Sequence, residues 1–76
     1  MKGSEDMRVK VELVTREDAA AMVRIATQVK ESVYLVGEGF RVSAKSLLGA
    51  LCSMEWNELW CECEKDIYSK IEKFVV

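Results

Sequence analysis

The chain has 76 residues, half of them apolar and 32% charged, and its eleven basic and thirteen acidic side chains give a net charge of −2. A chain this short forms one domain and buries only roughly 60% of the surface that its unfolded form exposes. The charge provides no basic field for phosphates, so we expect no nucleic-acid partner. No stretch approaches the roughly 20 apolar residues of a membrane span, so we expect no membrane contact.

Histidine is absent from the chain, and cysteine occurs three times. The lack of histidine excludes phosphohistidine chemistry, histidine acid–base catalysis and histidine metal ligation. The odd number of cysteines and the lack of an apolar leader argue against a secreted disulfide framework. We therefore expect a cytoplasmic protein that is not an enzyme and that uses no cofactor and no metal.

The first part of the chain predicts a leader and a strand. Residues 1–6 are polar and aperiodic, so we interpret them as a disordered leader before a single domain at residues 7–76. Residues 8–13 alternate between polar and apolar, which predicts a strand with one wet face. The buried face of this strand is expected to hold Val9, Val11 and Leu13.

A helix is predicted to follow this strand. Thr15 precedes Asp18 by three residues, as in a capping box, and the acidic Glu17 and Asp18 suit the positive end of a helix dipole. Lys30 and Glu31 are expected to close the helix. Its apolar stripe is expected to hold Ala19, Met22, Val23, Ala26 and Val29.

The middle of the chain predicts a hairpin and a short helix. Residues 32–36 are β-branched and aromatic, Gly37 and Gly39 suit a turn, and residues 40–42 form the returning strand. Either Ser43 or Ser46 is placed to cap a helix over residues 47–54, in which a glycine suggests close packing.

The last third predicts a fourth strand over residues 59–64, after a loop in which Trp56 has no assignable role. Its alternation places Leu59, Cys61 and Cys63 on one face. Asp66 is expected to cap a last helix with Ile67, Ile71, Phe74 and Val75 inward. The fold class is therefore α+β, with the element order βαββαβα and an antiparallel sheet that is covered by helices on one face.

This element order and the run Lys45-Ser46-Leu47-Leu48-Gly49 resemble the HPr family, the histidine-containing phosphocarrier proteins of the bacterial sugar phosphotransferase system. The likeness extends from about residue 8 to residue 76. It implies an open-faced β-sandwich with strand order 1-4-2-3 and three helices on one face. It also implies that Ser46 corresponds to the regulatory serine of the family.

The phosphoacceptor loop of the family is degenerate in this chain. Where the family has a histidine followed shortly by an arginine and a proline, this chain has Thr15, Glu17 and Asp18. Acidic side chains stand where a phosphate would need donors and a cation. The sequence therefore predicts a divergent member without phosphoenolpyruvate-dependent carrier activity.

We interpret the segment from Ser46 to Met54 as the docking surface for an unidentified protein partner. The resemblance implies this role, and Lys45, Leu47, Leu48 and Leu51 are the expected contact residues, although an ordinary satellite core is an alternative for the leucines. Ser46 is either a simple helix cap or a cap that is also a regulatory phosphosite.

Two alternative functions belong to other classes. Cys61 and Cys63 would carry the chemistry of a small thiol or redox protein, with Cys52 as a third thiol, although an inner face favours packing as small hydrophobes. Tyr34 and Trp60 on the open sheet face would form the interface of a self-associating homodimer, or only a cross-strand aromatic pair.

Overall fold

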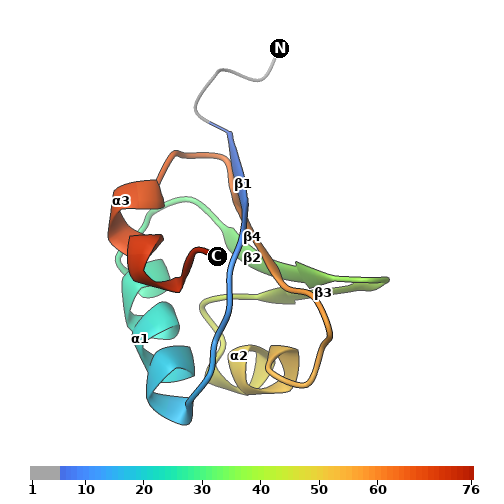
Figure 1. The fold of residues 1–76 in the computed structure, drawn as a ribbon. Helices are drawn as coiled ribbons and strands as arrows, with labels where there is room; N and C mark the ends of the chain where they lie inside the picture. Colours follow the sequence, from blue (N-terminus) through green and yellow to red (C-terminus); the bar gives the residue numbers. More distant parts are fainter. Residues whose placement is uncertain (1–5) are drawn as a thin grey trace.

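The computed structural model describes residues 6–76, and the leader expected at residues 1–6 therefore lies, except for Asp6, outside the described residues. Four strands, β1 (Met7–Lys10), β2 (Val33–Gly37), β3 (Phe40–Ser43) and β4 (Trp60–Cys63), form one antiparallel sheet in the order β1-β4-β2-β3. The α+β class and the strand order 1-4-2-3 are as predicted. The sheet is seen nearly edge-on in Figure 1, with α1 and α3 on one side of it.

The helices are α1 (Arg16–Thr27), α2 (Leu47–Ser53) and α3 (Tyr68–Ile71), and a 3-10 turn (Glu72–Phe74) follows α3 directly. They cover the sheet face on which Val33, Leu35 and Cys61 are fully buried. The predicted alternation of β4 is confirmed, because Leu59, Cys61 and Cys63 are all buried. One core, shared by this face and the three helices, holds the domain together.

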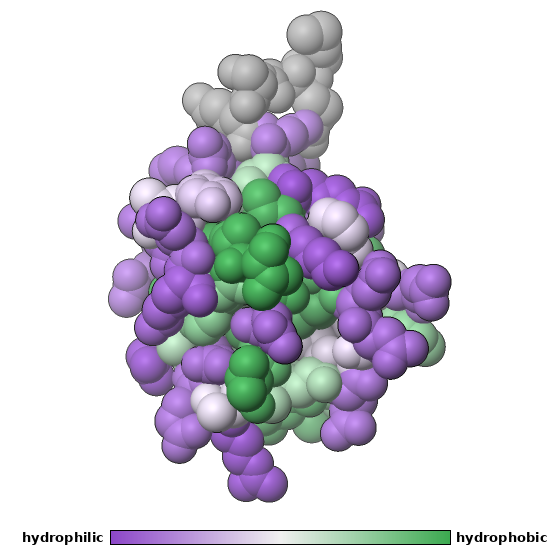
Figure 2. Space-filling view, viewed as in Figure 1, coloured by the Kyte–Doolittle hydropathy of each residue, from purple (hydrophilic) through white to green (hydrophobic). Residues whose placement is uncertain are grey.

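The first strand is shorter than the predicted residues 8–13, but its pairing continues beyond Lys10. Val11 donates a hydrogen bond to the Leu59 carbonyl at 2.9 Å and forms an isolated bridge with Val75. The C-terminal segment thereby lies beside the end of β1 (Figure 1). Hydrophobic side chains gather around this segment on the face drawn in Figure 2, and hydrophilic ones surround them.

Helix α1 begins as predicted but ends early, at Thr27 rather than at residues 29–31. The backbone tightens there, because Gln28 and Val29 donate to carbonyls only three residues back, those of Ile25 and Ala26, at 3.1 Å each. Val29 nevertheless keeps its predicted place in the core with 5% of its surface exposed. Lys30 and Glu31, which were expected to close the helix, lie beyond its end, and Lys45 Nζ donates to the Val29 carbonyl at 2.7 Å.

The hairpin between β2 and β3 uses its two glycines for different purposes. Only Gly39 has a positive φ, at 77°, so it alone supplies the left-handed residue of the turn. Gly37 lies under the indole of Trp56, and an added Cβ would come within 2.6 Å of Trp56 Cε3. The last helix also departs from expectation: Ile67 is its cap residue, and Asp66 Oδ1 instead accepts a hydrogen bond from the Tyr68 N–H at 3.0 Å.

Candidate docking surface

Helix α2 presents two adjacent leucines to solvent. Leu47 is 49% exposed and Leu48 is 72% exposed, whereas Leu51 is half-buried and packs against the core. The helix buries its other side through Ala50 and Ser53. The sequence left open whether these leucines form a satellite core, and the structure shows that two of the three do not. We call Lys45, Ser46, Leu47, Leu48 and Leu51 the α2 surface.

Ser46 fixes where this surface begins. It is the N-cap residue of α2, and its Oγ accepts a hydrogen bond from the Gly49 N–H at 3.1 Å. The serine is exposed, so its hydroxyl is accessible from solvent. Gly49 permits close packing on β3, since a Cβ there would lie 3.1 Å from Val42 Cβ. Ser43, the other predicted cap, accepts instead from the Lys45 N–H at 3.1 Å.

The loop that leads into α1 is occupied by a capping box. Thr15 Oγ1 accepts from the Asp18 N–H at 3.1 Å, and Asp18 Oδ2 accepts from the Thr15 N–H at 3.2 Å and from the Val14 N–H at 2.9 Å. The Asp18 carboxylate therefore takes two backbone donors that an incoming anion would need, and Glu17 adds a second acidic side chain in the same turn. The Asp18 side chain therefore occupies the position at the start of α1 that an external anion would need.

The thiols of Cys61 and Cys63 lie in the core, and Cys52 is exposed. Burial, together with the smaller effects of the nearby Cys63 and Glu62, raises the pKa of Cys61 from 9.0 to about 12. A thiol that holds its proton this firmly is a poor nucleophile at neutral pH. The arrangement fits two small core side chains better than a redox pair.

The open face of the sheet places Tyr34 opposite Glu62 and Trp60 opposite Val36. The rings therefore do not stand directly across from each other. Each is covered by an arginine: the Arg41 guanidinium lies 3.8 Å from the centre of the Tyr34 ring, and that of Arg8 lies 4.9 Å from the Trp60 ring. These cation–π contacts give both rings a partner within the chain, as an alternative to a second copy.

Trp56, for which the sequence suggested no role, anchors the far end of the hairpin. Its ring stacks on Phe40 with the ring centres 5.4 Å apart and 21° between the planes. The sequence signal for this contact was the pair of glycines flanking Glu38. Gly39 serves the turn, whereas Gly37 allows the Trp56 side chain to approach the backbone. Phe40 itself remains 59% exposed.

Within residues 6–76, no group of three or more acidic or cysteine side chains is arranged to hold a metal ion. None of the helices formed by these residues has the length and apolar character needed to cross a bilayer. No match was found among protein-family models, curated proteins or solved structures. The geometry of the α2 surface and the resemblance in the sequence are therefore the grounds for a function.

Proposed function

We propose that this chain is a non-catalytic regulatory or adaptor protein, related to HPr and of the phosphotransferase type, that binds a protein partner through the α2 surface. The observation that carries the proposal is the exposure of Leu47 and Leu48 directly after the capping Ser46. Two adjacent apolar side chains that the fold leaves uncovered, next to a modifiable hydroxyl, suit a regulated contact with another protein.

The fold supports the relation to HPr. The strand order β1-β4-β2-β3 is the one that the resemblance implied, and the run from Lys45 to Gly49 occupies the start of the second helix, as it does in the family. A fold hosts many functions, so this support concerns ancestry more than activity. The proposed partner-binding function rests on the exposure of the α2 surface.

The loss of carrier activity follows from the entrance to α1. The chain has no histidine, and the Asp18 carboxylate already takes the backbone donors of Val14 and Thr15. A phosphate in this place would meet Asp18 and Glu17 at short range, where like charges repel. A partner-binding role without phosphotransfer from phosphoenolpyruvate is consistent with both observations.

Ser46 is the proposed point of regulation. Its hydroxyl is exposed, and a phosphate on Oγ would add up to two negative charges beside Leu47 and Leu48. The neighbouring Lys45 donates one hydrogen bond from Nζ to the Val29 carbonyl, and an ammonium group carries three protons that can be donated. Phosphorylation would thus change the character of the docking surface from apolar to acidic.

The first experiment tests phosphotransfer. The protein is incubated with phosphoenolpyruvate and the general enzyme of the phosphotransferase system, with a histidine-containing HPr as the positive control, and intact masses are measured. We expect the mass of this protein to stay unchanged while the control gains one phosphate. An acid-labile phosphate on this chain would contradict the proposal.

The second experiment tests the α2 surface with HPr kinase and ATP. We expect one stable phosphate, lost in Ser46→Ala and retained in Ser69→Ala, which removes a serine that is exposed on α3. Leu48→Ser should weaken binding of the kinase in an amide-shift titration, whereas Val76→Ser, at a side chain with 67% exposure outside α2, should not. Equal binding by both variants would remove the α2 surface from the proposal.

A further inference from the structure

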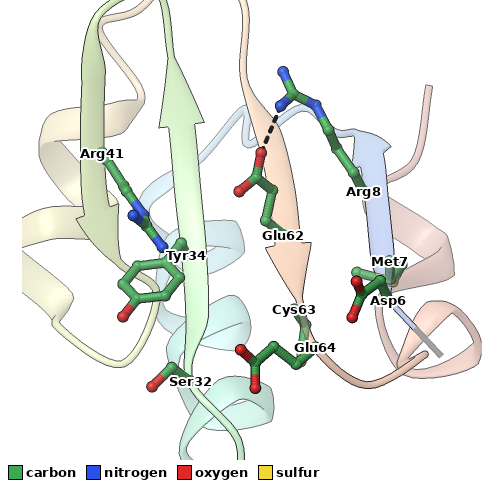
Figure 3. Close-up of a pocket in the computed structure, with 9 residues that line it drawn as sticks. All are labelled: Asp6, Met7, Arg8, Ser32, Tyr34, Arg41, Glu62, Cys63 and Glu64. Carbon is green, nitrogen blue, oxygen red and sulfur yellow. Dashed lines mark hydrogen bonds and ion pairs between the residues drawn. The ribbon is translucent and has the colours of Figure 1, made fainter. Parts of the chain in front are cut away.

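A hollow of about 450 Å³ lies on the open face of the sheet, on the side away from the helices. Side chains from all four strands and their ends line it, and most of them are polar or charged (Figure 3). Polar groups that converge on a concavity mark a candidate small-molecule site. The α2 surface does not contribute to the hollow, so a ligand bound here would not depend on the proposed docking role.

The wall of the hollow on the β3 side is cationic. The Arg41 guanidinium carbon lies over the Tyr34 ring, 3.8 Å from its centre, and within the described part of the chain no carboxylate is paired with it. A guanidinium that is stacked in this way keeps its N–H edge free for a bidentate contact with a carboxylate. The hydroxyls of Tyr34 and Ser32 point along the same wall (Figure 3) and add two donors.

The opposite wall, from β4, is acidic. Glu62 faces Tyr34 across the strand pair and binds Arg8 through Oε2 at 2.6 Å. Its other oxygen, Oε1, has no hydrogen bond to any residue between 6 and 76. Glu64, the residue after the end of β4, lies at the lower end of the hollow in Figure 3.

These two walls select for a ligand with both charges. A plain anion that reached Arg41 would face Glu62, and a plain cation at Glu62 would face Arg8 and Arg41. Neighbouring strands are about 4.8 Å apart, and β2 lies between β3 and β4, so these two strands are two spacings apart. The Arg41 guanidinium lies over the Tyr34 ring on β2, and Tyr34 pairs with Glu62, so the charged ends of Arg41 and Glu62 are between one and two spacings apart. A single amino acid is too short, whereas two residues extend over about 7 Å.

We propose that the hollow binds a zwitterionic ligand of dipeptide size, with its carboxylate on Arg41 and its ammonium group beside Glu62. Tyr34 and Ser32 provide further hydrogen bonds to the carboxylate end. The Arg8–Glu62 ion pair holds the Glu62 carboxylate in place on the sheet, so that its Oε1 atom is presented to the ammonium group.

The test is an amide-shift titration of the ¹⁵N-labelled protein with alanyl-alanine at millimolar concentrations. We expect saturable shifts confined to β2, β3 and β4 around Tyr34, Arg41 and Glu62. N-acetyl-alanyl-alanine lacks the ammonium group and alanyl-alanine amide lacks the carboxylate, and each should bind at least about tenfold more weakly. Absence of shifts, or equal affinity for either blocked peptide, would overturn the proposal.

Variants locate the site. Arg41→Ala should abolish the shifts and Arg41→Lys should weaken binding, because lysine keeps the charge but not the planar fork. Arg24→Ala is the matched control, since Arg24 is exposed on α1 and far from the hollow in the fold. Arg41 is also exposed, and the dispersion of the same spectra reports whether each variant is folded. Wild-type affinity in Arg41→Ala would refute the assignment.

Discussion

The contact between Gly37 and Trp56 permits a direct test of the packing at the end of the hairpin. In Gly37→Ala, the new Cβ would lie 2.6 Å from Trp56 Cε3, 3.0 Å from Trp56 Cδ2 and 3.3 Å from the Glu58 carbonyl oxygen. Optimal carbon contacts are about 3.5–4.0 Å, so the indole must move by roughly 1 Å. Its stacking on Phe40 opposes this movement.

The expected cost is the balance of two opposing effects. Overpacking typically costs about 1–3 kcal/mol, and the smaller conformational freedom of unfolded alanine returns about 0.4–1 kcal/mol. The difference ranges from about 0 to 2.6 kcal/mol, and we expect Gly37→Ala to lower the free energy of unfolding by about 1.3 kcal/mol, the middle of this range. In a domain of this size, each kcal/mol corresponds to roughly 4–8 °C in Tm.

Urea denaturation followed by far-UV circular dichroism measures this cost, and a double-mutant cycle identifies its cause. In a Trp56→Leu background the indole is gone, so Gly37→Ala should cost little. Gly39→Ala is the matched control: nothing lies within 4 Å of its added Cβ, and its cost comes from the φ of 77°, about 1–2 kcal/mol in either background. An undiminished cost of Gly37→Ala in Trp56→Leu would refute the steric argument.

Two further predictions concern the helix entrance and the core thiols. Thr15→Ala removes the oxygen that accepts from the Asp18 N–H and should lower the free energy of unfolding by about 1 kcal/mol in urea denaturation, whereas Thr15→Ser should restore most of it; no loss in the alanine variant would contradict the capping role. Burial raises the pKa of Cys61 from 9.0 to about 12. Above pH 9 the Cys61 thiol therefore loses its proton in the unfolded chain but keeps it in the folded chain. The free energy of unfolding should fall as the pH rises from 9 towards 12. Cys61→Ala should show a smaller fall than wild type, and at neutral pH Cys52 should react with a thiol reagent before Cys61 and Cys63; rapid labelling of all three would count against the buried arrangement.

Much of the fold was predictable because its signals are local. Alternation assigned Cys61 and Cys63 to the inner face, and the spacing of Thr15 and Asp18 indicated the start of α1, because both patterns depend on residues only two or three positions apart. The same local reasoning narrowed the cap of α2 to Ser43 or Ser46, and the structure identifies it as Ser46. The strand order came from the resemblance to HPr, since alternation does not say which strands are neighbours.

The features that sequence reasoning missed depend on contacts between distant segments. The early end of α1 goes with a hydrogen bond from Lys45, sixteen residues beyond Val29. The partners of Tyr34 and Trp60 are set by strand register, which places arginines from the two edge strands over the rings. The exposure of Leu47 and Leu48 was left open by sequence because it depends on which side of a two-turn helix meets β3.

The pairing of β1 has a consequence for how the chain reaches its native state. Arg8 and Glu62, which face each other across β1 and β4, are 54 positions apart, and the hairpin of β2 and β3 is the single piece of this sheet built from neighbours in sequence. During ribosomal synthesis, β1 therefore emerges long before any strand exists that can pair with it. The hydrophobic interior closes only when β4 and the Val75 bridge are in place, so long-range contacts govern the assembly of this domain.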